Sequence, residues 1–283
     1  MEKQLIGRGV LAGALAGFLA FVFARIFAEP VIQKAIDYES ARDGIQDALD
    51  KAAGMAMPAA GPDIFSRTVQ STVGIGAALV LFGAAMGALF AVAYVICLGR
   101  TGRIAPRPLA LLLAAAGFLG FYLVPFVKYP ANPPAIGHEE TIGPRAGLYL
   151  VMVVSSVLFM YLAVYFGQLL APRLGNWRTS LLMGAAFVVA IGIVMALLPP
   201  LGHLHENVVD YGRHATETPR PLKDAQGNLV FPGFDADLLY RFRLYSVGAQ
   251  LIMWTTIGLV FGPLAERVLA PVARREAREP ATV

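Results

Sequence analysis

The chain has 283 residues, of which 57% are hydrophobic and only 15% are charged. Soluble domains carry about 25% charged residues, so this composition excludes an ordinary soluble domain and indicates a membrane protein with several spans. The net charge is +4, but no basic runs are interleaved with aromatic residues, so we expect no nucleic-acid partner. The single cysteine, Cys97, excludes an internal disulfide and a metal site built from several cysteines.

Six apolar runs are each long enough to cross the roughly 30 Å hydrocarbon layer of a bilayer as a helix. They cover residues 6–28, 69–98, 108–127, 146–171, 180–199 and 244–269. We therefore expect an all-α membrane protein: a six-span transmembrane helix bundle forming a single integral membrane domain over residues 1–283. The alternative for the first run is a cleaved signal peptide, but its apolar stretch is longer than a typical signal core.

Arginine is concentrated in the short connections, which gives the expected orientation. The loops after the second and fourth runs and the C-terminal tail contain arginine and few or no acidic residues. Short basic loops stay on the cytoplasmic side, so both termini should be cytoplasmic. The longer segments 29–68, 128–145 and 199–243 should then form long outer loops.

The first outer segment begins at Glu29-Pro30, and proline is well suited to the first turn of a helix. Its apolar residues recur near helical spacing, which predicts an amphipathic helix lying on the outer surface. Four carboxylates follow one stripe of this helix: Glu39, Asp43, Asp47 and Asp50. The stripe is either a solvated helix face or a surface that attracts cations.

Glycines in the first two spans recur at a spacing of four residues. They are Gly9, Gly13 and Gly17 in the first span, and Gly83 and Gly87 in the second. Small residues at this spacing permit close contact between helix backbones, so we expect these glycines to serve packing.

The third and fifth spans both end in proline on the outer side, at 124–134 and at Pro199-Pro200. Proline leaves backbone carbonyls without helical partners, which membranes tolerate where the backbone is buried or lines a wet cavity. If these two ends are neighbours, their loops converge at one mouth.

The loop that follows the fifth span holds three of the four histidines. Imidazole suits zinc, copper, nickel and cobalt ions, and carboxylates add negative charge. We therefore predict metal ligands among His203, His205, His214, His138, Glu206 and Asp210. Their spacing matches no closed zinc motif, and the alternative is a polar loop whose histidines are solvated.

The rest of that loop shows turn and capping signals. Residues 224–228, DAQGN, predict a turn between two short extended pieces, and Asp235 or Asp237 should cap the final helix. Within the final span, Gln250 and Trp254 share a face, and we expect Gln250 to point into the bundle.

No Asp, Glu, Lys or His lies near the middle of any predicted span. Ion-coupled carriers commonly place charged groups there, so we expect this chain to need another polypeptide to move an ion. No P-loop is present, and nothing arranges three ligands with a general base. We therefore expect neither an enzyme nor a bound cofactor.

Four stretches together resemble the CbtA family, cobalt transporter subunits of bacterial membranes. They are FARIFAEPVIQKAIDYE at 23–39, GAALVLFGAAMGALFAVAY at 76–94, GFLGFYLVPFVKYPANPP at 117–134 and YRFRLYSVGAQLIMWTTIGLVFG at 240–262. The resemblance implies cobalt uptake across the bacterial inner membrane beside a small, single-span, histidine-rich companion, CbtB. It also marks motif positions, which we take as pathway or packing candidates: Lys128, Tyr129, Asn132, Pro133, Pro134, Thr141, Arg145, Arg243, Gln250 and Trp254.

We interpret the chain as a membrane subunit of a Co²⁺ uptake transporter that captures the ion with outer-loop histidines and carboxylates. One alternative is a nickel transporter subunit, because Co²⁺ and Ni²⁺ both accept imidazole. The other is a non-transporting scaffold or metal-delivery partner, which the uncharged spans favour.

Overall fold

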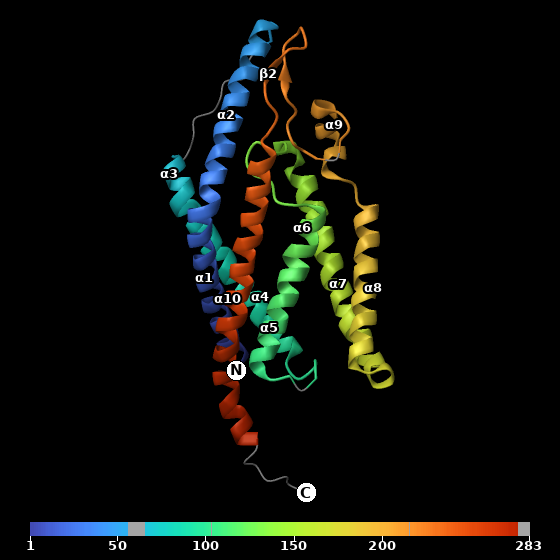
Figure 1. Ribbon diagram of the computed structural model, residues 1–283. Coiled ribbons are helices and arrows are strands. Elements are labelled where there is room, and N and C mark those ends of the chain that lie inside the picture. The colour runs from blue at the N-terminus through green and yellow to red at the C-terminus, as the bar shows by residue number, and fades with distance from the viewer. Residues whose placement is uncertain (56–65, 103, 215, 277–283) are drawn as a thin grey trace. The chain divides into compact units, whose positions relative to one another are not determined.

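A computed structural model describes residues 1–55, 66–102, 104–214 and 216–276, with backbone only at 210, 211 and 271–276 (Figure 1). Within these residues, six helical segments are long and apolar enough to cross a membrane. They are Glu2–Ala52, Arg67–Cys97, Pro106–Lys128, Glu139–Leu174, Asn176–His203 and Ala236–Ala270. Each contains or closely matches one predicted span, which confirms the all-α, six-span architecture.

The first span and the predicted amphipathic helix form one continuous helix. It comprises α1 (Glu2–Phe23), a π-helical stretch (Ala24–Ala28) and α2 (Glu29–Ala52). The π-helical stretch ends two residues before Pro30, whose missing N–H removes one helical hydrogen bond. The helix expected at 29–52 is therefore present, but the structure joins it to the first span instead of separating the two.

The chain groups into two compact units. Unit 1 contains Met1–Glu29, Asp63–Leu119 and Tyr245–Val283, and unit 2 contains Pro30–Pro62 and Gly120–Leu244. The single integral membrane domain expected over residues 1–283 stays a prediction.

In unit 1, α1 packs against α4 (Ile75–Cys97), which follows α3 (Arg67–Val69) and a π-helical stretch (Gln70–Gly74). The predicted glycines lie at this contact. A Cβ atom on Gly13 would lie 2.0 Å from the carbonyl oxygen of Gly83, and one on Gly87 would lie 2.1 Å from that of Gly9. The two backbones therefore touch directly, and a larger side chain has no space here.

The remaining helices of unit 1 are α5 (Pro106–Gly117) and the part of α10 (Ala236–Glu276) that begins at Tyr245. The Trp254 indole covers Gly117, where a Cβ would lie 2.1 Å from indole Cζ3. The Phe261 ring meets those of Phe90 and Tyr94 edge to face, with centroids 5.2 and 5.0 Å apart. These contacts form the main apolar core of unit 1.

Unit 2 is built around the antiparallel pair α7 (Ile142–Leu174) and α8 (Asn176–Leu197), joined at Gly175, whose φ is +78°. A π-helical stretch (Phe118–Leu123) leads into α6 (Val124–Lys128), and 3-10 turns occupy Glu139–Thr141 and Leu201–His203. The short helix α9 (His205–Tyr211) follows. The Tyr129 hydroxyl donates to the Pro199 carbonyl at 2.8 Å, so the two proline-rich helix ends are neighbours.

A two-stranded antiparallel hairpin, β1 (Leu222–Lys223) and β2 (Leu229–Phe231), completes unit 2. Its turn is the one predicted at residues 224–228. The Asp224 carboxylate accepts hydrogen bonds from the Gln226 and Asn228 backbone N–H groups, at 3.0 and 2.8 Å. Asp235 accepts from the Asp237 N–H at 2.8 Å and so caps α10, which confirms the predicted helix start.

Replacing Gly13 by leucine should destabilise the chain, because the side chain would force α1 away from α4. Overpacking typically costs about 1–3 kcal/mol, and contact with a rigid backbone places this change at or above the upper end. Thermal unfolding in detergent measures the loss. The matched control is Gly192→Leu in α8, where a Cβ meets nothing within 4 Å. Equal melting temperatures for the two variants would contradict the close contact.

Candidate functional site

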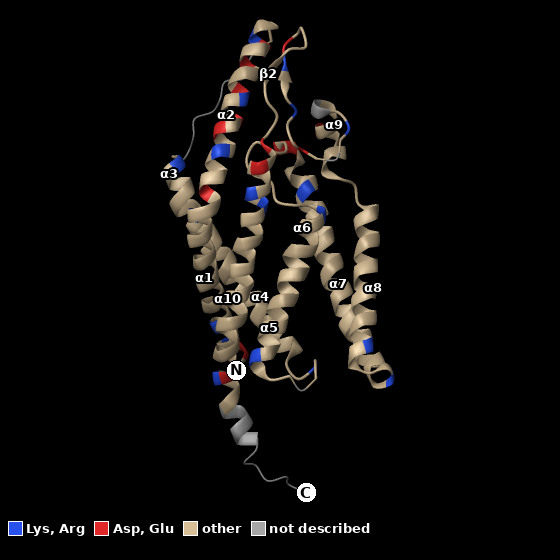
Figure 2. Cartoon of the chain, in the orientation of Figure 1, with Lys and Arg blue, Asp and Glu red and all other residues tan. Residues whose placement is uncertain are grey.

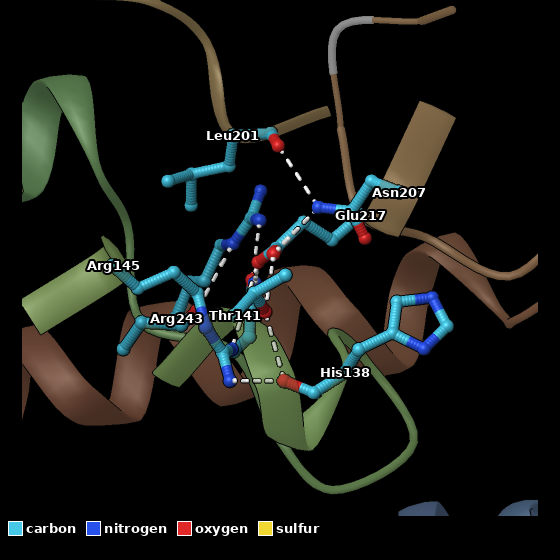
Figure 3. Close-up of polar contacts among 9 residues, drawn as sticks. His138, Thr141, Arg145, Leu201, Asn207, Glu217 and Arg243 are labelled. Atoms are coloured by element: carbon cyan, nitrogen blue, oxygen red, sulfur yellow. Dashed lines mark hydrogen bonds and ion pairs between the residues drawn. The ribbon is translucent and has the colours of Figure 1, made fainter. Parts of the chain in front are cut away.

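Glu217 is a buried carboxylate in unit 2, and four side chains surround it (Figure 3). Its Oε1 accepts hydrogen bonds from Thr141 Oγ1 at 3.2 Å and Asn207 Nδ2 at 2.9 Å. Its Oε2 accepts from Asn132 Nδ2 at 3.4 Å and lies 3.5 Å from Arg145 Nη1. A buried carboxylate is costly without such partners, so these contacts allow Glu217 to remain inside the protein. We call these five residues the Glu217 cluster.

The turn before α7 positions two members of this cluster. The His138 carbonyl oxygen accepts from Arg145 Nη2 at 3.2 Å and, at 2.8 Å, shares the single hydroxyl hydrogen of Thr141 with Glu217 Oε1. Gly137, with φ of +95°, lets the guanidinium approach, because a Cβ there would lie 2.5 Å from Arg145 Nη1. Glycine is therefore required at 137 for two reasons, its backbone angle and the close arginine.

A second glycine, Gly202, lets the loop that carries Glu217 pack closely against the chain. A Cβ on Gly202 would lie 2.1 Å from the His214 carbonyl oxygen and 2.6 Å from that of Thr216. The segment leading to Glu217 therefore lies directly on the 3-10 turn after α8. Asn207 strengthens this arrangement, since its Nδ2 also donates to the Leu201 carbonyl at 2.9 Å.

Arg243, near the start of α10, connects to the cluster through Asn132. Its Nη2 donates to Asn132 Oδ1 at 2.9 Å, and its Nε donates to the Ala131 carbonyl at 3.3 Å. The Asn132 amide thus accepts from Arg243 with one atom and donates to Glu217 with the other. The proline-rich segment after α6 is held between the final helix and the buried carboxylate.

Two cavities flank this segment, and both lie within unit 2. The smaller has a volume of about 80 Å³ and is lined in part by Lys128, Asn132, Glu217 and Arg243. The larger, of about 400 Å³, is lined mainly by apolar and aromatic residues, with Arg145 and Asn132 as polar members. Pro130 and Leu201 border both cavities, so the proline-rich helix ends line open space, which is one of the two alternatives that the sequence left open.

The predicted metal ligands do not gather into one group where the structure describes them. His203 and His205 are exposed, one in the 3-10 turn and the other at the first residue of α9, while Glu206 and His214 are half-buried. The side chain of Asp210 lies outside the described residues. Among the residues that the structure describes, no three His, Cys, Asp or Glu side chains lie together in a way that could hold a metal ion.

His138 contributes its backbone to the Glu217 cluster. Its carbonyl oxygen, rather than its imidazole, faces Thr141 and Arg145 (Figure 3). A metal role for the histidines of this chain therefore stays a prediction.

The sequence-derived pathway and packing candidates divide between the two units. Asn132, Arg145 and Arg243 take part in the contacts around Glu217, and Lys128 lines the smaller cavity. In unit 1, Trp254 is buried in the core and Gln250 is half-buried.

Glu217 itself was missed by sequence reasoning. It stands in a loop rich in threonine and proline, where no periodicity or spacing distinguishes an enclosed acid from a solvated one. The available signal was indirect: Asn132, Thr141 and Arg145 are polar residues that need buried partners, and one unassigned acid lay on the facing loop.

A family model described as probable cobalt transporter subunit (CbtA) matches residues 2–266, nearly the whole chain. The chain belongs to the CbtA family. No curated protein and no solved structure matches it significantly. Membership in CbtA supports a role as a cobalt transporter subunit, and the match covers every residue of the Glu217 cluster. In this CbtA chain, the conspicuous polar site of the described structure is thus a set of arginine, asparagine and threonine side chains around one acid.

Replacing Glu217 by alanine should destabilise the protein by about 3–5 kcal/mol, because Arg145 and two amide donors would lose their buried acceptor. Glu217→Gln should cost less, since the amide keeps one acceptor oxygen. Unfolding in detergent provides the measurement. Glu140→Ala removes an exposed acid from the adjacent turn and serves as the control. If Glu217→Ala and Glu140→Ala unfold alike, the carboxylate does not hold this region together.

Proposed function

We propose that this chain is the membrane subunit of a Co²⁺ uptake transporter in the bacterial cytoplasmic membrane. The observation that carries the proposal is the family match over residues 2–266, whose description is a probable cobalt transporter subunit. The six helical segments long enough to span a membrane support the same role.

Ion capture is assigned to the exposed histidines and not to the interior of the Glu217 cluster. His203 and His205 are accessible on the turn after Pro200, and Glu206 supplies a nearby carboxylate. The smaller cavity is lined by Lys128, Arg243 and a carboxylate already paired with Arg145. Excess positive charge repels a divalent cation, so Co²⁺ should meet the loop histidines first.

A second polypeptide is part of the proposal. The word subunit in the family description implies a partner component, and the middles of the predicted spans lack Asp, Glu, Lys and His. Ion pathways through membranes commonly use such groups. We infer that a small, single-span, histidine-rich companion of the CbtB kind completes the transport path.

The uncharged spans also support the second candidate, a scaffold or metal-delivery partner that transports nothing. A nickel transporter subunit fits the same ligand types.

The proposed orientation rests on the charges of unit 2. Arg173 and Arg178 flank the turn between α7 and α8, which has no acidic residue, whereas acidic and basic residues are mixed at the opposite end of α7 (Figure 2). Short basic turns remain cytoplasmic. A reporter inserted after Gly175 should therefore read cytoplasmic, and one inserted after Gly227, in the β1–β2 turn, should read external. Both glycines have open surroundings and should accept an insertion. A cytoplasmic signal at Gly227 would refute the orientation.

Uptake of ⁵⁷Co into proteoliposomes tests the function. The purified chain should accumulate the ion only when the companion is co-reconstituted, because the spans alone offer no charged path. Full uptake by the single chain would contradict the need for a partner. Binding of ⁵⁷Co without uptake, with or without the companion, would instead support metal delivery.

The double variant His203→Ala/His205→Ala separates capture from folding. It should weaken Co²⁺ binding in calorimetry at least about tenfold, or about 1.4 kcal/mol, and leave the melting temperature unchanged because both side chains are exposed. Gln226→Ala, in the exposed β1–β2 turn, is the control on the neighbouring loop. Unchanged Co²⁺ affinity in the double variant would show that these histidines do not bind the ion and belong to an ordinary solvated loop.

A further inference from the structure

The smaller cavity of unit 2 has an unusual polar lining. Its volume is about 80 Å³, and its polar side chains are those of Lys128, Asn132, Thr216, Glu217, Thr218 and Arg243. Because about 10–15 Å³ of such space holds one water, the cavity has room for several waters or one small polyatomic ion.

Positive charge around the cavity exceeds negative charge. The carboxylate of Glu217 is paired with Arg145, which leaves it little capacity to neutralise a second cation. The half-buried Arg243 bonds only to neutral oxygens, those of Ala131 and Asn132, among the residues described. The ammonium of Lys128 lies 5.7 Å from the Tyr129 ring centroid, and no described carboxylate pairs with it. The cavity therefore carries two cationic groups in excess.

The remaining lining groups also favour an anion. Arginine and lysine donate hydrogen bonds to oxyanions, and a partly desolvated guanidinium is stabilised by a negative partner. The hydroxyl groups of Thr216 and Thr218 can donate as well. A divalent cation would meet a single carboxylate here, that of Glu217, which is already paired with Arg145, and two positive lining side chains, Lys128 and Arg243.

We propose that this cavity binds an oxyanion of the phosphate type, held by Lys128 and Arg243. Glu217 also lines the cavity, and its charge is offset by its ion pair with Arg145. The same chemistry is offered by free inorganic phosphate and by the headgroup of an anionic lipid. Lys128 directly follows the apolar run that ends at residue 127, the depth at which headgroups are found. The proposal is independent of cobalt transport.

Thermal unfolding of the purified full chain tests the site. In neutral detergent, sodium phosphate should raise the melting temperature above that in sodium chloride of equal ionic strength. A rise of about 3–5 °C is expected near ten times the dissociation constant. In the second arm, the chain is placed in phosphatidylcholine bilayers with or without phosphatidylglycerol. Stabilisation by phosphate identifies a free oxyanion, and stabilisation by phosphatidylglycerol alone identifies a lipid headgroup.

Lys128→Gln is the informative variant, because its ammonium makes no described hydrogen bond that the fold would lose. It should weaken the stabilising ligand at least tenfold while leaving the ligand-free melting temperature within about 2 °C. Arg243→Gln should abolish binding but also loses the hydrogen bonds to the Ala131 carbonyl and the Asn132 side chain, so it is secondary. Arg178→Gln, in the first turn of α8 and outside the cavity lining, is the matched control. The proposal is overturned if neither ligand stabilises the wild type, or if Lys128→Gln and Arg178→Gln respond alike.

Discussion

A carboxylate enclosed by protein must find enough donors to replace water, and in this chain that requirement organises unit 2. Glu217 has donors from three separate segments around it: the loop after α6, the start of α7 with the turn before it, and the short helix after α8. The contact with Asn132 fixes the irregular backbone after α6, and those with Arg145 and Asn207 tie in α7 and α9. The helix ends, the two cavities and the start of α10 are thereby held in one arrangement around a single side chain.

The local features of this fold were predictable, because neighbouring residues determine them. The lengths of the apolar runs located the six spans. Asp224 forms the predicted β1–β2 turn, and Asp235 forms the predicted cap of α10. The spacing of Gly9 and Gly13 indicated the close packing seen between α1 and α4. The cluster around Glu217 was not predictable in the same way, since its members are far apart in sequence and depend on the path of the loops. The continuous α1–α2 helix was also missed, because a π-helical stretch let Pro30 follow the span without a break.

The histidines show that closeness in sequence does not by itself produce a metal site. His203 and His205 are close in sequence, yet a helical boundary separates them, and the described residues contain no ready-made metal site. In the proposed role, the exposed His203 and His205 would bind the ion with few ligands and then release it. A strong, enclosed metal site would oppose release, so a loosely arranged set of ligands suits a protein that passes its ion onward.

The sequence positions of the cluster also bear on how the protein is made. The first residue of the cluster is Asn132, and its last connection is Arg243. After Asn132, a stretch of more than a third of the chain must therefore still emerge before all these contacts can form. Until the final helix enters the bilayer, Asn132 lacks one of its partners. A chain with a misrouted loop could not complete these contacts. The full set of contacts around the buried acid can therefore form only after the segments between Asn132 and Arg243 have been synthesised.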